Sequence, residues 1–222
     1  MTRPPILTEH GYEPVRGLPE SLPEGEVLLW QGAPQWRAFA RHALRLRWIG
    51  AYFGVLAAWR GWVLLGEGAP AHEALAGALW LVLIGAVPLA LLALYAVLVA
   101  RTTVYTLTSQ RLVLRVGVAL PLTINLPFAA VQSADLRRHA DGTGDIAIGL
   151  APPHRIAWLM LWPHARPWRL RDPVPMLRAL PEPEAAAQAL TRALASVAGQ
   201  AVPAAAAEAG PQRTGGLRPA AA

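Results

Sequence analysis

The segment from Ala74 to Ala100 reads ALAGALWLVLIGAVPLALLALYAVLVA, which is 27 consecutive residues without a charged side chain. As a helix it would be about 40 Å long, whereas the hydrocarbon core of a bilayer is only about 30 Å thick. A buried helix of a soluble protein is rarely this long and this uniformly apolar. The composition therefore predicts a transmembrane helix over residues 74–100.

A second apolar segment, residues 48–66, precedes the first and is less uniform. Tryptophan and tyrosine prefer the two membrane interfaces, so their positions indicate how two segments are aligned. In an antiparallel pair, Trp48 would lie level with Tyr95, and Trp59 would lie level with Trp80. Because the two aromatic patterns agree, we predict a two-helix transmembrane hairpin.

Arg60 interrupts the second segment and allows two interpretations. It could be an intramembrane charge that serves a relay or a channel. Alternatively, its long side chain extends to the interface among the neighbouring tryptophans. Glu67 follows seven residues later, which is about 10 Å along a helix. This short distance favours the interfacial interpretation.

The charges that flank the two segments predict the orientation of the hairpin. Its connecting loop, residues 67–73, contains two glutamates and no arginine. Arginines lie on the other side of both segments, at Arg37, Arg41, Arg45, Arg47, Arg101, Arg111 and Arg115. Since positive charge stays on the cytoplasmic side, we predict a multi-pass membrane protein with both termini in the cytoplasm.

The lead-in to the hairpin, residues 25–47, carries Arg37, Arg41 and Arg45 at a spacing of four. This spacing predicts an interfacial helix whose arginine face lies on anionic head groups. An ordinary positively charged flank explains the same arginines equally well. In either case the three side chains are candidate contacts with anionic lipid.

Small residues recur every fourth position at the start of the hairpin, at Gly50, Gly54 and Ala58. Such a face lets helix backbones approach closely. It could hold the hairpin together, or it could bind the helix of another protein. We therefore include Gly50 and Gly54 among the candidate contact residues.

From Thr102 onward the apolar pattern changes from helical to alternating, which predicts a soluble β domain over residues 102–198. The predicted strands are residues 103–108, 111–116, 122–126, 131–139, 146–150, 156–162 and 168–171. An amphipathic helix follows, with Pro183 in its first turn. We expect the ends of the chain, residues 1–24 and 199–222, to be disordered.

The sequence contains no recognisable catalytic or metal-binding motif. There is no cysteine, no two of the six histidines share a helix at ligand spacing, and no phosphate-loop or hydrolase motif is present. The stretch DGTGD at residues 141–145 lacks the acid spacing of a calcium loop, so we interpret it as a hairpin turn. We predict no enzyme, cofactor or metal. The net charge of +6 fits either nucleic acid or an anionic membrane surface as partner, and the predicted membrane spans make the membrane the simpler choice.

Three parts of the chain carry a resemblance to known proteins. They are LPEGEVLLWQG at residues 22–32, TVYTLTSQRLVLRVG at residues 103–117, and the set NLPF at 125–128, DGTGD at 141–145 and LWPHARPW at 161–168. The second part resembles the opening hairpin of bacterial pleckstrin-homology-like domains attached to membrane spans. The set is similar to PuhB-type photosynthetic complex assembly proteins of purple bacteria.

This resemblance implies an α+β membrane protein, in which a pleckstrin-homology-like antiparallel domain closed by a C-terminal helix follows the transmembrane hairpin. It implies a non-catalytic factor of the bacterial inner (intracytoplasmic) membrane that assembles the photosynthetic reaction centre and core light-harvesting complex. Subunits of those complexes and anionic lipid are the implied partners, and self-association would fit. An alternative is a general lipid- or peptide-binding module that is not dedicated to photosynthesis.

The stretch from Trp162 to Trp168 is the strongest candidate for partner contacts, through Trp162, His164, Arg166 and Trp168. The alternative is a turn at the end of a strand, in which the tryptophans are buried anchors. The resemblance supplies no catalytic residues.

Overall fold

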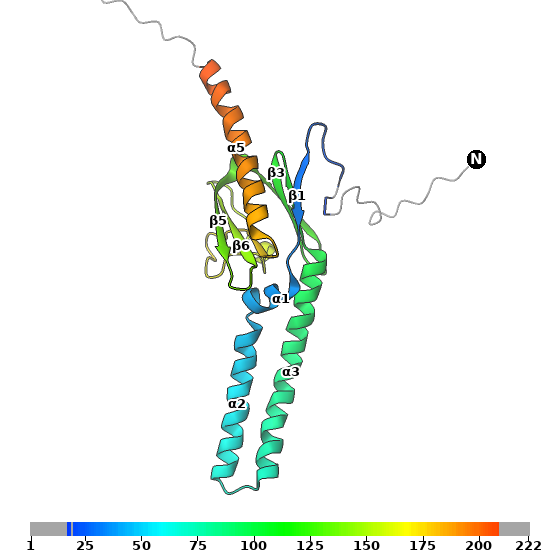
Figure 1. Ribbon diagram of the computed structural model, residues 1–222, viewed down its shortest axis with the longest axis vertical. Coiled ribbons are helices and arrows are strands. Elements are labelled where there is room, and N and C mark those ends of the chain that lie inside the picture. The colour runs from blue at the N-terminus through cyan, green and yellow to red at the C-terminus, as the bar shows by residue number, and fades with distance from the viewer. Residues whose placement is uncertain (1–16, 19, 209–222) are drawn as a thin grey trace, which may run out of the picture.

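The structure is a computed structural model that describes residues 17, 18 and 20–208. A β domain sits at one end of a long helical hairpin, and the segment around α1 lies where the two parts meet (Figure 1). The hairpin and the domain are therefore distinct in shape. The way in which they are joined decides where the candidate site lies.

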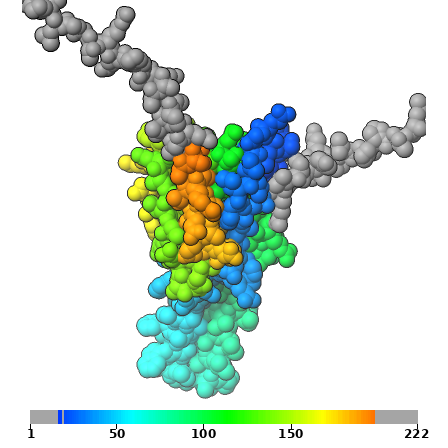
Figure 2. Space-filling view, turned by 45° about the horizontal axis from the view of Figure 1, so that its top comes forward, coloured from blue at the N-terminus to red at the C-terminus, as the bar shows by residue number. Residues whose placement is uncertain are grey.

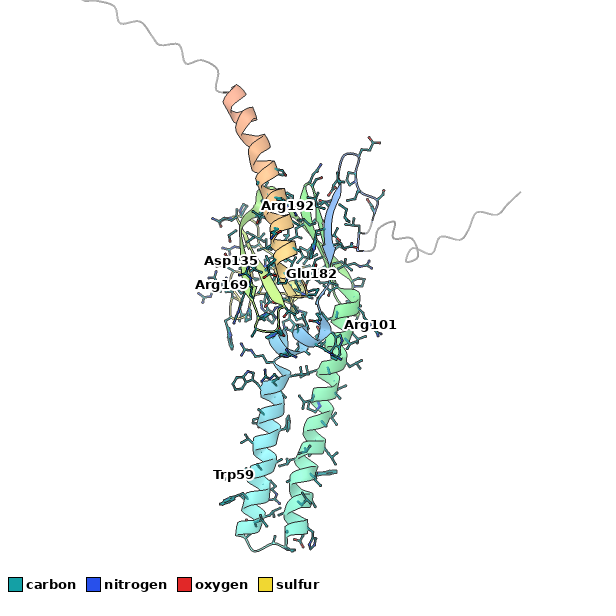
Figure 3. All side chains as sticks on the ribbon, in the orientation of Figure 1. Trp59, Arg101, Asp135, Arg169, Glu182 and Arg192 are labelled. Atoms are coloured by element: carbon teal, nitrogen blue, oxygen red, sulfur yellow. The ribbon has the colours of Figure 1, made fainter. Side chains whose placement is uncertain are left out.

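Two helices form the hairpin: α2 (Leu46–Gly66) and α3 (Ala71–Thr102), which contain the predicted segments 48–66 and 74–100. Both are long and apolar enough to cross a membrane. Most of their large apolar side chains are exposed, and Trp59 lies on the side of α2 that faces away from α3 (Figure 3). Such a surface is unfavourable in water. The pair is suited to a bilayer rather than to the core of a soluble protein.

Glycines of α3 let the two helices approach each other. Gly85 lies against the side chain of Phe53, and Gly77 lies against Leu64 and the stem of Arg60. Residue numbers rise along α3 as they fall along α2 at these contacts, so the helices are antiparallel, as the aromatic pattern predicted.

The predicted small-residue face of α2 does not hold the hairpin together. A side chain added at Gly54 would meet nothing within 4 Å, and Ala58 is exposed. Gly50 approaches α3 only at the side chain of Leu89. The prediction that small residues at every fourth position pack α2 against α3 is therefore wrong for Gly54 and Ala58. A contact with the helix of another protein stays a prediction.

The β domain contains two antiparallel sheets, ordered β1-β2-β3-β4 and β5-β6-β7. The strands are β1 (Leu28–Gly32), β2 (Val104–Thr108), β3 (Arg111–Val116), β4 (Leu122–Pro127), β5 (Val131–Arg138), β6 (Gly144–Leu150) and β7 (Met176–Leu180). A short 3-10 helix, η2 (Phe128–Ala130), connects the two sheets. The predicted strands from residue 103 to residue 150 are thus confirmed, with small shifts at their ends.

The lead-in contributes the first strand of this domain. In β1, Trp30 pairs with Leu107 of β2 and Gln31 pairs with Thr106. The hairpin is therefore inserted between two neighbouring strands of one sheet. This corrects the predicted boundaries, because residues 28–32 belong to the domain that was expected to begin at residue 102.

Two predicted strands are wrong, and β7, like β1, was not predicted. Residues 156–162 contain the short helix α4 (Trp158–Leu161), and residues 168–171 form no strand. A short apolar run fits a buried helical turn as well as a strand, so its pattern could not separate the two. Strand β7 was missed because Arg178 interrupts its apolar pattern.

Helix α5 (Pro183–Glu208) closes the domain and begins at the predicted proline. In Figure 2 it lies between β1 on one side and β5 on the other, and Leu190 packs into the core. Because the helix continues to Glu208, residues 199–208 are not the disordered tail that the composition predicted. The rest of that tail, residues 209–222, lies outside the described residues, as do residues 1–16.

The core of the domain lies between the two sheets and α5. Its fully buried side chains include Tyr105, Leu107, Leu112, Leu114, Ile146, Ile148, Leu161 and Leu180. A second, smaller core forms where the hairpin meets the domain. It joins α1 (Trp36–Ala38) and the π-helix η1 (Phe39–Ala43) to the end of α3 and to β7, through Ala38, Phe39, Ala40, Ala96, Val99 and Ala179. We call this the junction core.

Candidate functional site

The chain bends where it leads from the junction core into the hairpin, and we call residues 39–45, which contain η1 and Arg45, the elbow. Arg45, between η1 and α2, has a φ of 54°, a left-handed conformation that residues other than glycine adopt rarely. The predicted interfacial helix is therefore two short helical turns followed by a bend. Its arginines have separate environments, because Arg37 lies 5.3 Å from the centre of the Trp36 ring and Arg41 binds a carboxylate.

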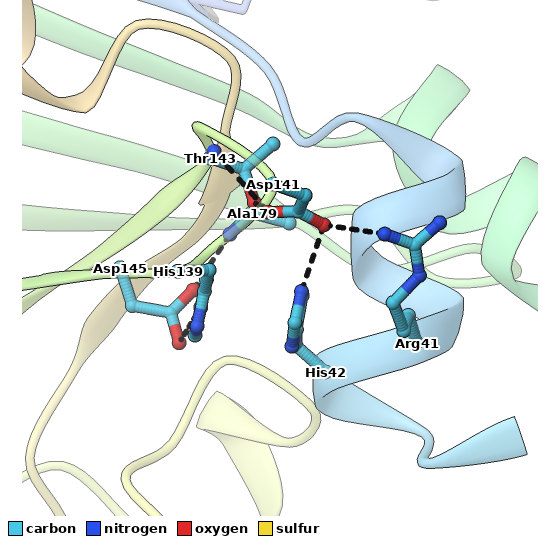
Figure 4. Close-up of polar contacts among 7 residues, drawn as sticks. All are labelled: Arg41, His42, His139, Asp141, Thr143, Asp145 and Ala179. Carbon is cyan, nitrogen blue, oxygen red and sulfur yellow. Dashed lines mark hydrogen bonds and ion pairs between the residues drawn. The ribbon is translucent and has the colours of Figure 1, made fainter. Parts of the chain in front are cut away.

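Asp141, the first residue of the DGTGD turn, ties the elbow to the β5–β6 turn (Figure 4). Its Oδ2 accepts a hydrogen bond from Arg41 Nη1 at 2.8 Å and lies 2.9 Å from Nε2 of His42. Its Oδ1 accepts the Thr143 hydroxyl hydrogen at 2.6 Å. The hydrogen bonds from Thr143 and His42 hold the pKa of Asp141 well below its usual range. Arg41, predicted to face lipid head groups, is thus bound to an ionised carboxylate of the same chain.

Two histidines and a second aspartate extend this contact toward β7. The ring of His42 stacks on that of His139, with 3.9 Å between ring centroids and 3° between planes. His139 Nε2 lies 3.2 Å from Asp145 Oδ2, although without hydrogen-bond geometry. Asp145 Oδ1 accepts the backbone N–H of Ala179 at 2.8 Å. The elbow is therefore fixed to the β5-β6-β7 sheet.

A groove with a volume of about 520 Å³ opens between the elbow and this sheet. It is lined by Arg41, His42, Ala43, Arg45, Trp48, Asp135, Leu136, Arg137, His139, Asp145, Ala147, Arg166, Pro167, Trp168, Met176 and Arg178. Five of these residues are arginines and two are aspartates. We call it the cationic groove, and it is the candidate functional site.

Arg178 of β7 is the most deeply buried arginine of the cationic groove, with 7% of its surface exposed. Its Nη1 donates a hydrogen bond to the carbonyl oxygen of Pro163 at 3.1 Å, whereas its Nε has no partner among the described residues. Burial lowers the pKa of its guanidinium, and the nearby Asp145 carboxylate opposes that effect. Buried polar groups without partners are rare and costly. The groove therefore contains an incompletely satisfied positive group.

His164 is the centre of a buried polar network rather than a surface contact. Its Nδ1 lies 2.8 Å from the Tyr105 hydroxyl, and its Nε2 lies 3.3 Å from that of Thr103. Burial and the positive charge of Arg178 lower the pKa of His164 to about 3, so the ring is neutral at pH 7. The Tyr105 oxygen also accepts the backbone N–H of Arg178 at 3.1 Å. The prediction that His164 contacts a partner is wrong, because this network encloses it.

The three other predicted contact residues of this segment are more exposed than His164. The ring of Trp162 is half exposed and stacks on Tyr95 of α3, with centroids 5.7 Å apart. It is therefore partly an anchor between domain and hairpin. Trp168 is 94% exposed, and Arg166 Nη1 lies 4.0 Å from an Asp135 oxygen. Trp168 and Arg166 both line the cationic groove.

The structure brings together four of the predicted contact residues, Arg41, Arg45, Arg166 and Trp168, in this one groove. It leaves Arg37, Gly50 and Gly54 outside the groove lining. Sequence reasoning missed Arg137 and Arg178, which no motif marks. Within the described part of the chain, no group of histidine and acidic residues is arranged to hold a metal ion.

Two antiparallel sheets closed by a helix define a pleckstrin-homology-like domain. This domain is joined to an apolar hairpin that is long enough to anchor it in a membrane. Residues 45–195 match the family described as Bacterial PH domain, and the chain belongs to that family. It is also 37% identical over 190 residues to an uncharacterized 23.7 kDa protein in the puhA 5′ region of Rhodobacter capsulatus. That match covers 84% of this chain and 89% of the relative. No solved structure matches the chain.

Proposed function

We propose that this protein is a non-catalytic assembly factor for the photosynthetic reaction centre and core light-harvesting complex, acting by protein binding. The observation that carries the proposal is the similarity, over most of both chains, to a protein described by its place beside puhA. The motifs NLPF, DGTGD and LWPHARPW, which resemble PuhB-type assembly proteins, support the same context.

The proposal places the protein in the bacterial inner (intracytoplasmic) membrane, with α2 and α3 spanning the bilayer and both termini in the cytoplasm. The loop at residues 67–73 carries two glutamates and no arginine. At the opposite end of the hairpin, Arg101 lies beside the β domain (Figure 3). This asymmetry is typical of a cytoplasmic domain.

The architecture suits a protein that holds another membrane protein during assembly. The open face of α2 at Gly54 leaves room for the helix of a partner subunit, or of a second copy of this chain. The junction core fixes the β domain above that face. A partner that crosses the membrane would therefore meet the hairpin and the domain together.

A deletion strain tests the proposal. It should contain less reaction centre and core light-harvesting complex, while pigment synthesis continues. A tagged copy should co-purify subunits of those complexes from photosynthetically grown membranes. Normal complex levels in the deletion strain would refute the assembly role.

Complementation of the deletion strain with two valine variants tests where the partner binds. Gly54→Val fills the open face of α2 without touching α3, and it should lower complex levels. Gly66→Val is the matched control, since it also meets nothing within 4 Å but lies at the last residue of α2. Equal rescue by both variants would exclude the Gly54 face as the contact.

The cationic groove favours a second candidate function. A cationic cavity on a membrane-anchored domain is what a general lipid- or peptide-binding module would have, without any role in photosynthesis. This function predicts normal complex levels in the deletion strain, so the same experiment separates the two candidates.

A further inference from the structure

The positive charge of the cationic groove is not balanced by the acids around it. Arg45 and Arg137 line the groove, and neither has an ion-pair partner in the part of the chain that the structure describes. Arg41, by contrast, is paired with Asp141. An unpaired cation that faces a cavity can accept an anionic ligand without first breaking a protein contact.

A third arginine converges on the same space. Arg178 is buried, it lines the groove, and its Nε has no partner among the described residues. The positive charges of Arg137 and Arg45 are close enough to disfavour that of Arg178, and Asp145 is the acid that opposes them. A bound anion would relieve the repulsion among the three guanidinium groups and supply acceptors for their free N–H groups.

The position of the groove indicates where such an anion comes from. Trp48, in the first turn of α2, and Trp168 both line the groove and are 72% and 94% exposed. Exposed tryptophans at the end of a transmembrane helix lie at the head-group level of a bilayer. Beyond Trp48, the surface of α2 presents exposed apolar side chains such as Tyr52 and Val55. A ligand with a charged head and apolar chains fits both surfaces.

We propose that the cationic groove binds the phosphate of an anionic glycerophospholipid from the cytoplasmic leaflet, between Arg45, Arg137 and Arg178. Trp48 and Trp168 flank the lipid backbone, and the acyl chains follow the apolar surface of α2. This inference goes beyond the assembly role, with which it shares only the membrane placement of the hairpin, and it names the ligand of the second candidate function. It can therefore fail or succeed independently of that role.

The test uses the full-length protein in neutral detergent, with bound lipid counted by native mass spectrometry. Phosphatidylglycerol and phosphatidylcholine are added in separate titrations, because both contain a phosphate but only the first has a net negative charge. We expect phosphatidylglycerol to bind at least tenfold more tightly. A further arm adds millimolar inorganic phosphate as competitor, which should not displace the lipid. Displacement by phosphate would show a site for free phosphate and overturn the lipid assignment.

A double variant, Arg45→Asn with Arg137→Gln, should weaken phosphatidylglycerol binding by roughly 25-fold, since each basic residue near an anionic lipid contributes about a factor of five. Asparagine is chosen for position 45 because it tolerates the left-handed backbone there. The matched control, Arg171→Gln with Arg192→Gln, removes the same charge from exposed positions outside the groove. Equal binding by the two double variants would overturn the proposal.

A single variant guards against misfolding of the double variant. Because the Trp168 side chain is almost fully exposed, Trp168→Asn should leave the melting temperature unchanged. It should nevertheless weaken phosphatidylglycerol binding by a few-fold. Unchanged lipid binding in this variant, together with equal binding of phosphatidylglycerol and phosphatidylcholine by the native protein, would exclude the groove as a lipid site.

Discussion

Replacing Tyr105 by phenylalanine removes one oxygen atom from the buried network without creating a large cavity. That oxygen accepts the backbone N–H of Arg178 and is hydrogen-bonded to Nδ1 of His164. Tyr105 and His164 are fully buried, and only 7% of the Arg178 surface is exposed. Water cannot take the place of the hydroxyl group without rearranging the core, so both groups lose a partner.

The size of the effect follows from these two contacts. A buried polar group that loses its partner costs about 1–3 kcal/mol, so Tyr105→Phe should reduce the free energy of unfolding by about 3 kcal/mol. For a chain of this length, 1 kcal/mol corresponds to about 2–4 °C in melting temperature. We therefore expect the melting temperature to fall by about 6–12 °C.

Thermal unfolding of the full-length protein in a neutral detergent, followed by circular dichroism, measures this change. The matched control is Tyr52→Phe, which removes the same oxygen atom from an exposed side chain of α2. The control should melt within 1–2 °C of the native protein, or about the effect of an ordinary surface substitution. If both variants melt alike, the Tyr105 hydroxyl does not hold the network together.

Three further predictions concern acid stability, helix packing and topology. Folding lowers the pKa of His164 from 6.5 to about 3. Between these two pH values the histidine is protonated in the unfolded chain and neutral in the folded chain. Stability should therefore fall as the pH drops through this range, by up to about 1.4 kcal/mol per pH unit, and His164→Gln should flatten the measured slope. Gly85→Val should separate the two helices and lower the melting temperature, whereas Gly54→Val, with open space around it, should not; a reversed order would contradict the packing. A topology reporter fused at Ala71 should report the periplasm and one fused after Ala222 the cytoplasm, and the opposite result would invert the hairpin.

Local sequence patterns predicted those parts of the fold whose interactions are close in the chain. The strand pair from residue 103 to residue 116 is joined by a tight turn, so its alternation and its turn residues lie together in the sequence. The β5–β6 hairpin, closed by the DGTGD turn, is predictable for the same reason. The antiparallel alignment of α2 with α3 was predictable as well, because only a short loop separates the two helices.

Pairings between distant segments could not be predicted in this way. Gln31 of β1 and Thr106 of β2 are 75 residues apart and separated by the whole hairpin. Nothing in the local pattern of residues 28–32 indicates that partner. Strand β7 is similar, because Arg178 breaks its apolar pattern and the burial of that arginine depends on the packing of β6 and η1 around it.

Composition and local pattern were enough to predict the apolar hairpin, its charge asymmetry, the succession of strands from residue 103 to residue 150 and the start of the last helix. Each depends on composition or on contacts between near neighbours, for which periodicity is sufficient. The folded structure alone shows which arginines share a surface. It paired Arg41 with Asp141, buried His164, and gathered Arg45, Arg137 and Arg178 around one groove. These arginines come from the elbow, β5 and β7, which meet only when the junction core and both sheets have formed.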